Sequence, residues 1–178
     1  YTAKPNGINK QIRLIDFDGK VDERLSYELG ASNLAHWSPD GQTLLYTHFT
    51  TTSTELALQP VDRPQARLLR FPREIQPIGG SWGPNGEEIL VTVMKGGNAD
   101  IFRYELKSGK MFPLVRWPSL ETSPAWSPDG KRIAFVSDRK RFRQPRIYLY
   151  NIESREVTNL PFEGKYSSAP RWSPDSRQ

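Results

Sequence analysis

A run of basic side chains is the feature of this sequence with the clearest chemical potential. Residues 139–146 read Arg-Lys-Arg-Phe-Arg-Gln-Pro-Arg, so five positive charges surround one aromatic ring. Such a cluster attracts an acidic surface, and arginine and aromatic side chains are frequent anchors of protein interfaces. The candidate binding residues of this run are Arg139, Lys140, Arg141, Phe142, Arg143 and Arg146. A solvated hairpin loop with no ligand is the alternative interpretation of the same residues.

Trp117 is a second candidate binding residue, because it stands outside the repeat described below, in Arg116-Trp117-Pro118. Connections between elements often carry binding residues. Basic residues beside an aromatic ring also bind nucleic-acid strands. In this chain the basic run is confined to one loop, while acidic residues are dispersed through the rest. We therefore expect a protein partner with an acidic surface and no nucleic acid.

Residues for catalysis or metal binding are sparse. The chain has two histidines, His36 and His48, and neither belongs to a recognisable catalytic constellation. It contains no Gly-x-Ser-x-Gly elbow, no phosphate-cradling loop and no cysteine. Disulfides and thiolate metal sites are thereby excluded. We expect no enzyme activity, no cofactor and no metal. A small molecule or metal in a central channel would require repeated carboxylates that converge there.

The elements that position these residues are predicted by an internal repeat. Four phrases of the type Trp-Ser-Pro-Asp-Gly begin at Trp37, Trp82, Trp126 and Trp172, at spacings of 45, 44 and 46 residues. This period matches a four-stranded propeller blade of about 40–45 residues. The recurring indoles are expected to be equivalent wedges between successive blades, where a large aromatic ring buries much surface.

The repeated phrase also encodes a tight turn between antiparallel strands. Proline presets the first central position, Asp or Asn can bond its own backbone, and glycine supplies a positive φ. The recurrence of Asp40, Asp129 and Asp175 is therefore explained by turn chemistry rather than by a site. Ser176 replaces the glycine in the last copy, so that turn is expected to be frayed or completed differently.

Short apolar runs follow the first three turns and predict a strand buried on both faces. They cover residues 44–47, 89–93 and 133–136. A third strand of each unit is expected at 12–17, 56–58, 101–104 and 147–150, and a more polar outer strand, as at 156–160, completes the blade.

The fold class predicted is all-β: one propeller domain over residues 1–178, with about four four-stranded antiparallel blades. Joining the two termini would place Trp172 and Trp37 43 residues apart, which nearly equals the other spacings. The terminal strands would then pair to close a ring of four blades and remove the exposed sheet edges. The alternative is a segment of a larger propeller. The chain begins at Tyr1, which a processed N-terminus or a removed leader or domain would explain. No apolar run is long enough to span a bilayer.

With these motifs in view, the chain resembles the TolB-type β-propeller repeat family, a relative of WD-repeat propellers. The unit that carries the resemblance best runs from Ser123 through Trp126-Ser127-Pro128-Asp129-Gly130 to Tyr150, and such units cover essentially the whole sequence. The resemblance implies a propeller that is mostly bacterial and periplasmic or secreted, and that often serves as a docking platform. Similar propellers gate the catalytic domains of prolyl-oligopeptidase-like hydrolases.

Two functions follow as expectations. The first is a non-catalytic scaffold or docking subunit of a bacterial envelope or membrane-associated complex, periplasmic by resemblance, with membrane association through its partner. The second is the substrate-gating propeller of a prolyl-oligopeptidase-like hydrolase whose catalytic domain lies elsewhere.

Overall fold

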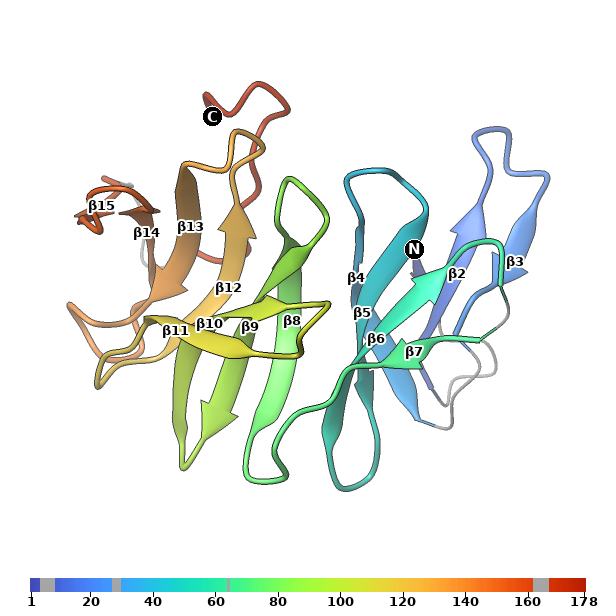
Figure 1. Cartoon of the computed structure of the whole chain (residues 1–178), viewed down its shortest axis with the longest axis horizontal. Helices are drawn as coiled ribbons and strands as arrows, with labels where there is room; N and C mark the ends of the chain where they lie inside the picture. The colour runs from blue at the N-terminus through green and yellow to red at the C-terminus, as the bar shows by residue number, and fades with distance from the viewer. Residues whose placement is uncertain (4–8, 27–29, 64, 162–166) are drawn as a thin grey trace. The chain divides into compact units, whose positions relative to one another are not determined.

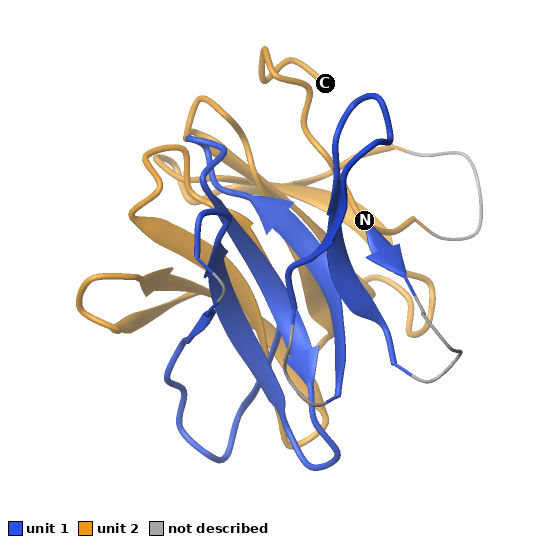
Figure 2. Cartoon of the chain, turned by 90° about the vertical axis from the view of Figure 1, so that its right-hand side faces the viewer, with its two compact units in different colours: residues 1–79 blue, residues 80–178 orange. Residues whose placement is uncertain are grey.

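The computed structural model of the chain describes residues 1–3, 9–26, 30–63, 65–161 and 167–178. All regular secondary structure in these ranges is β, and every paired strand belongs to an antiparallel sheet. The chain divides into two compact units, Tyr1–Gly79 and Gly80–Gln178 (Figure 2). The all-β prediction is confirmed.

The first unit contains two sheets (Figure 1). Three strands form the first sheet, in the order β1 (Thr2–Ala3), β2 (Gln11–Ile15) and β3 (Asp22–Arg24). The second sheet has four: β4 (Ala31–Trp37), β5 (Thr43–Phe49), β6 (Thr54–Pro60) and β7 (Arg67–Leu68). Ile12 and Leu25 of the first sheet's segment pack with Leu44, Tyr46 and Ala57 of the second, so stacked sheets make the core.

The second unit contains two four-stranded sheets (Figure 1). One comprises β8 (Gln76–Trp82), which begins before the boundary between the units, β9 (Glu88–Lys95), β10 (Asn98–Glu105) and β11 (Met111–Val115). The other comprises β12 (Glu121–Trp126), β13 (Arg132–Ser137), β14 (Arg146–Asn151) and β15 (Val157–Asn159). The core between them contains Leu90, Ile101, Ile133, Phe135 and Tyr148.

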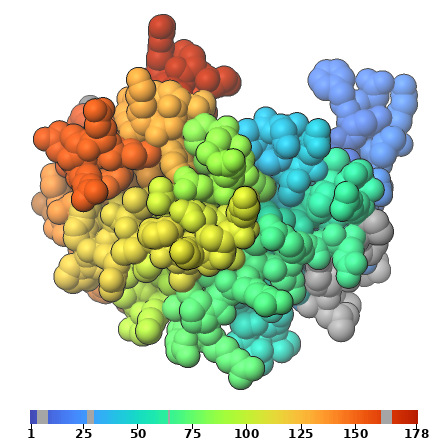
Figure 3. Space-filling view, viewed as in Figure 1, coloured from blue at the N-terminus to red at the C-terminus, as the bar shows by residue number. Residues whose placement is uncertain are grey.

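The apolar runs after the turns lie in β5, β9 and β13, and their side chains are nearly all buried, as predicted. The third strands are also where the sequence places them, with one correction. Phe17 was expected in the first of these strands but lies in the β2–β3 turn, and its side chain is fully exposed. This turn projects from the first unit (Figure 3). Asp16 causes the exit from the strand, because its Oδ1 accepts the N–H of Val21 at 2.9 Å and so closes the hairpin one residue before Phe17.

A residue with left-handed backbone conformation recurs three residues before each repeat tryptophan, and in two copies it coincides with a β-bulge. Leu34, Gly79, Ser123 and Ala169 all adopt φ between 49° and 61°, in the left-handed region. The strand pairing shifts at this place in β4 and in β12. An extra residue on one strand breaks the ladder locally and bends the strand. The left-handed residue is therefore a property of the repeat, and the sequence alone did not indicate it.

The tryptophans of the third and fourth copies pack on the copy before them. The Trp126 ring lies 3.2 Å from where a Cβ on Gly83 would be, and the indole N–H of Trp172 donates to the carbonyl of Ala125 at 2.9 Å. The first copy differs: Trp37 keeps 47% of its surface exposed, although a buried wedge was expected. The later rings pack on the first strand and the following turn of the preceding copy. In the described residues the sheet β1–β2–β3 has neither of these elements, so Trp37 has no equivalent surface to pack on.

The last turn is formed rather than frayed. Ser176 adopts φ 60°, the conformation that glycine adopts in the other copies, and its N–H donates to the Ser173 carbonyl at 3.0 Å. Its hydroxyl accepts the N–H of Asp129 at 2.9 Å, and its carbonyl accepts a hydrogen bond from Arg132. These bonds to the preceding copy offset the strain of a non-glycine residue in this conformation.

Candidate functional site

The basic loop, residues 138–145, joins β13 to β14 and has a defined shape. Asp138 holds it, since one carboxylate oxygen accepts the N–H of Leu120 at 3.0 Å and the other accepts the N–H of Arg143 at 3.3 Å. A turn bond from Gln144 N–H to the Arg141 carbonyl, at 3.0 Å, closes the tip. The loop is therefore anchored to the connection that precedes β12.

Two of the candidate residues from the sequence meet here. The Arg139 guanidinium lies over the Trp117 ring, with its carbon 3.8 Å from the ring centroid, and it is 5.6 Å from the ring of Tyr148. A cation above an indole face is attracted by the ring quadrupole, and a stacked guanidinium keeps its edges free to donate. The structure thus joins the basic loop and Trp117 into one surface.

The rest of the loop is presented to solvent. Phe142 has 77% of its surface exposed, and the Arg143 guanidinium lies 5.2 Å from its ring. Lys140 and Arg141 are exposed as well. Within the described part of the chain, no ion pair is formed by these cations. Arg146 differs, because it begins β14, is half-buried and has a buried Nη1 without a hydrogen-bond partner.

Glu121 supports the connection that carries Trp117, and sequence reasoning missed it. Its side chain is fully buried, and its carboxylate accepts the N–H of Trp117 at 3.3 Å, the Ser137 hydroxyl at 3.0 Å and the Ser119 hydroxyl. Burial raises the pKa of Glu121; the three hydrogen bonds oppose this, and the nearby Asp100 charge adds to it. A polar residue at the same repeat position, Ser32, was the available signal.

The other titratable candidates have structural partners. His48 is buried, and its Nδ1 lies 3.1 Å from the Ser32 hydroxyl, the pair that corresponds to Ser137 and Glu121. His36 is half-buried on β4. In the ranges that the structure describes, no cluster of three or more histidine, aspartate or glutamate side chains could hold a metal ion.

The recurring aspartates are turn residues, as their chemistry suggests. In three copies the serine of the motif donates its hydroxyl to the aspartate Oδ1, at 2.6, 2.6 and 2.7 Å for Asp40, Asp129 and Asp175. A backbone N–H two residues on donates to the same oxygen. These bonds, the serine hydroxyl first, lower the pKa of all three carboxyl groups.

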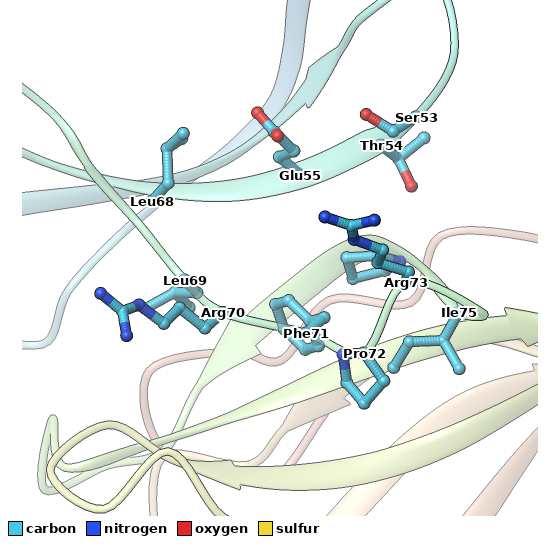
Figure 4. Close-up of a pocket in the computed structure, with 11 residues that line it drawn as sticks. Ser53, Thr54, Glu55, Leu68, Leu69, Arg70, Phe71, Pro72, Arg73 and Ile75 are labelled. Atoms are coloured by element: carbon cyan, nitrogen blue, oxygen red, sulfur yellow. The ribbon is translucent and has the colours of Figure 1, made fainter.

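Each unit also has an open groove. In the first unit a groove of about 680 Å³ lies between Ser53, Thr54, Glu55 and Leu68 on one side and the segment 69–75 on the other (Figure 4). In the second unit a groove of about 650 Å³ adjoins the basic loop, with Phe142 and Arg143 among the residues that line it. The second groove thus lies beside the candidate residues.

The "Uncharacterized peptidase YuxL" of Bacillus subtilis is 36% identical over 80 residues, which are 43% of this chain and 12% of that protein. The "Tol-Pal system protein TolB" of Francisella tularensis subsp. mediasiatica is 28% identical over 80 residues, 45% of this chain and 18% of that protein. The chain thus matches less than a fifth of either relative.

The crystal structure of TolB from Acinetobacter baumannii has the same fold, with a TM-score of 0.80 and 22% identity, and the match covers 94% of this chain and 41% of that one. This coverage fits the alternative of a segment of a larger propeller. No helix in the described residues has the length and apolar character to cross a membrane. The family match itself covers residues 1–178, and the chain belongs to the TolB beta propeller domain family.

Proposed function

We propose that this propeller segment is a non-catalytic docking module that binds an acidic surface on another protein. The surface that does so, here called the docking surface, consists of Trp117, Arg139, Lys140, Arg141, Phe142 and Arg143. The observation that carries the proposal is the stack of Arg139 on Trp117, beside an exposed Phe142 and cations that form no ion pair with any described residue. Tryptophan, tyrosine and arginine are over-represented among the residues that dominate binding energy at interfaces.

The charges would act mainly on the rate at which the partner associates and on the orientation in which it binds. Four cations on one ordered loop attract an acidic patch, and the attraction weakens as salt screens it. Phe142 would then be covered by the partner, which removes apolar area from water. Because Asp138 and the turn at the tip fix the loop backbone, little backbone conformational entropy is lost when the loop binds.

The setting of this function is proposed from relatives. One is named as a Tol-Pal system protein, and we extend to this chain a place in a bacterial envelope or membrane-associated complex, on the periplasmic side. In this setting the module reaches the membrane through its partner.

The experiment has two steps. Affinity purification from the native envelope, followed by mass spectrometry, identifies the partner, and calorimetry then measures its affinity for purified variants. Replacing Arg139, Lys140, Arg141 and Arg143 with serine is expected to weaken binding at least about tenfold and to flatten its salt dependence. The matched control makes the same serine replacement at four exposed lysines elsewhere in the second unit, so that both variants lose the same net charge. These lysines are Lys95, Lys107, Lys110 and Lys131. Equal affinity of both variants would refute the docking surface.

A second function is favoured by one observation, the 36% identity to a protein named as a peptidase. In this case the segment would gate substrate access to a hydrolase domain of the prolyl-oligopeptidase type. A fluorophosphonate probe labels activated serines and separates the two functions. Labelling of the native protein that contains this segment would support gating, and absence of labelling alongside a stable partner would support docking.

A further inference from the structure

Two large apolar side chains in the walls of the groove beside the basic loop are exposed among the residues that the structure describes. They are Phe142, 77% exposed, and Leu120, 39% exposed, on the connection before β12. The groove volume of about 650 Å³ lies in the range of about 300–1,000 Å³ that is typical of ligand sites. Large apolar side chains exposed close together are a feature of surfaces that bind a further chain.

Part of the groove lining is polar and belongs to the bulge in β12. Thr122 pairs with Val136, and the next pair of the ladder is Ala125 with Ala134, so Ser123 has no partner across the strands. Ser119, Thr122 and Ser123 all line the groove. Hydroxyl groups and a strand segment outside the ladder are suitable partners for the amides of an extended peptide.

The charged side chains that line the groove balance, and the basic loop beside it adds positive charge. Asp138 is the one acidic side chain among the described residues that line it, and both of its oxygens already accept backbone N–H groups. Arg143 lines the groove too, and Lys140 and Arg141 lie exposed on the same loop. Within the described residues these loop cations form no ion pair, so an incoming carboxylate is favoured over an incoming cation.

We propose that this groove binds an extended segment of the partner protein that carries an apolar side chain next to acidic residues. The apolar side chain packs against Leu120 and Phe142, and the neighbouring carboxylate pairs with Arg143. The peptide backbone bonds to the polar residues of the β12 bulge that line the groove. This inference rests on the proposed function and names the part of the partner that the docking surface recognises.

A defined peptide tests the groove directly. The probe is a fluorescent, N-acetylated and C-amidated peptide of sequence Gly-Glu-Asp-Leu-Glu-Asp-Gly, titrated with the whole 178-residue chain and followed by anisotropy. Binding is expected, and replacement of the leucine in the probe by glycine should weaken it about tenfold, since a buried leucine contributes about that factor. A probe with lysine at all four acidic positions should not bind.

Two protein variants test whether the probe binds in the groove. Leu120→Ser removes an apolar wall, and Ser168→Trp fills the groove from an exposed lining position. Each is expected to weaken probe binding about tenfold, while Ser154→Trp, at an exposed position of the β14–β15 hairpin, leaves it unchanged. Wild-type affinity in both groove variants, or stronger binding of an oligothymidine strand than of the acidic probe, would overturn the inference.

The two proposals fail in different ways. If the probe does not bind, but the serine replacement of the basic loop still weakens the natural partner, the docking surface stands and the groove inference falls. If the partner's affinity is insensitive to the basic loop, the docking function falls as well.

Discussion

Arg139 and Trp117 are 22 positions apart in the sequence, yet the guanidinium carbon of the first lies 3.8 Å from the ring centroid of the second. The stack connects the basic loop to the connection between β11 and β12. Trp117 in turn packs beneath on Phe135, with ring centroids 6.0 Å apart. The chemistry of the surface is thus built directly on the core of the second unit.

Replacement of Trp117 should affect both stability and binding. Trp117→Ala removes a half-buried ring that packs on the core, and we expect a loss of about 2–3 kcal/mol in the free energy of unfolding. It also leaves Arg139 without its stacking partner, so partner affinity should fall. Trp117→Phe keeps an aromatic face and should lose less of both. Urea denaturation and calorimetry provide the two readouts, and equal affinity of Trp117→Ala and wild type would contradict the role of the stack.

Glu121 should make stability depend on pH in an unusual direction. Because its pKa is raised in the folded chain, the folded state binds more protons than the unfolded state in the interval above the ordinary value of 4.5. Its contribution to stability is present below that value and is lost as the pH rises through the folded pKa. Glu121→Gln cannot titrate, so the free energy of unfolding of wild type, minus that of Glu121→Gln, should decrease as the pH rises from 4.5. A constant or increasing difference would contradict this account.

Gly83 is the place where restoring the repeated motif should do harm. The other three copies have serine there, but a Cβ at Gly83 would lie 3.1 Å from the Glu88 carbonyl and 3.2 Å from the Trp126 ring. Gly83→Ser and Gly83→Ala should both destabilise the fold, by about 1–3 kcal/mol, because the close packing leaves no space. Thermal denaturation measures the effect. A stabilised Gly83→Ser variant would show that the Trp126 ring yields readily.

Ser176 offers the converse comparison. Ser176→Ala keeps the unfavourable left-handed conformation but loses the bond to the Asp129 N–H, and should cost about 1 kcal/mol. Ser176→Gly loses the same bond but removes the strain, so it should be closer to wild type. Urea midpoints of the two variants decide this; an equal or larger loss in Ser176→Gly would mean that strain at this residue is negligible.

The repeat made the blades predictable, because each copy encodes its turn and its buried strand within a few residues. The Trp-Ser-Pro-Asp-Gly phrase determines local bonds such as that of Ser127 to Asp129, at 2.6 Å. Phe17 was misplaced because an apolar residue after a strand is indistinguishable from its last residue until the Asp16 turn is known. The turn at Ser176 was expected to be frayed or completed differently, and it is completed by bonds to the preceding copy.

Less of the candidate site than of the fold could be predicted from the sequence. The exposed basic loop follows from composition, but its stacking on Trp117 depends on two separate connections meeting. Glu121 was missed because its role arises from Trp117, Ser119 and Ser137, which only the folded sheet brings together. Contacts of this kind lie between repeat copies or connections, where no local pattern encodes them.

Photo-cross-linking tests the central claim most directly. A benzoylphenylalanine placed at Phe142, 77% exposed on the docking surface, is compared with one at Phe17, fully exposed on the β2–β3 turn of the other unit. Both positions replace an exposed phenylalanine, so they differ in place rather than in chemistry. We predict cross-linking to the partner from position 142 and none from position 17. Cross-linking from position 17 with none from position 142 would contradict the account.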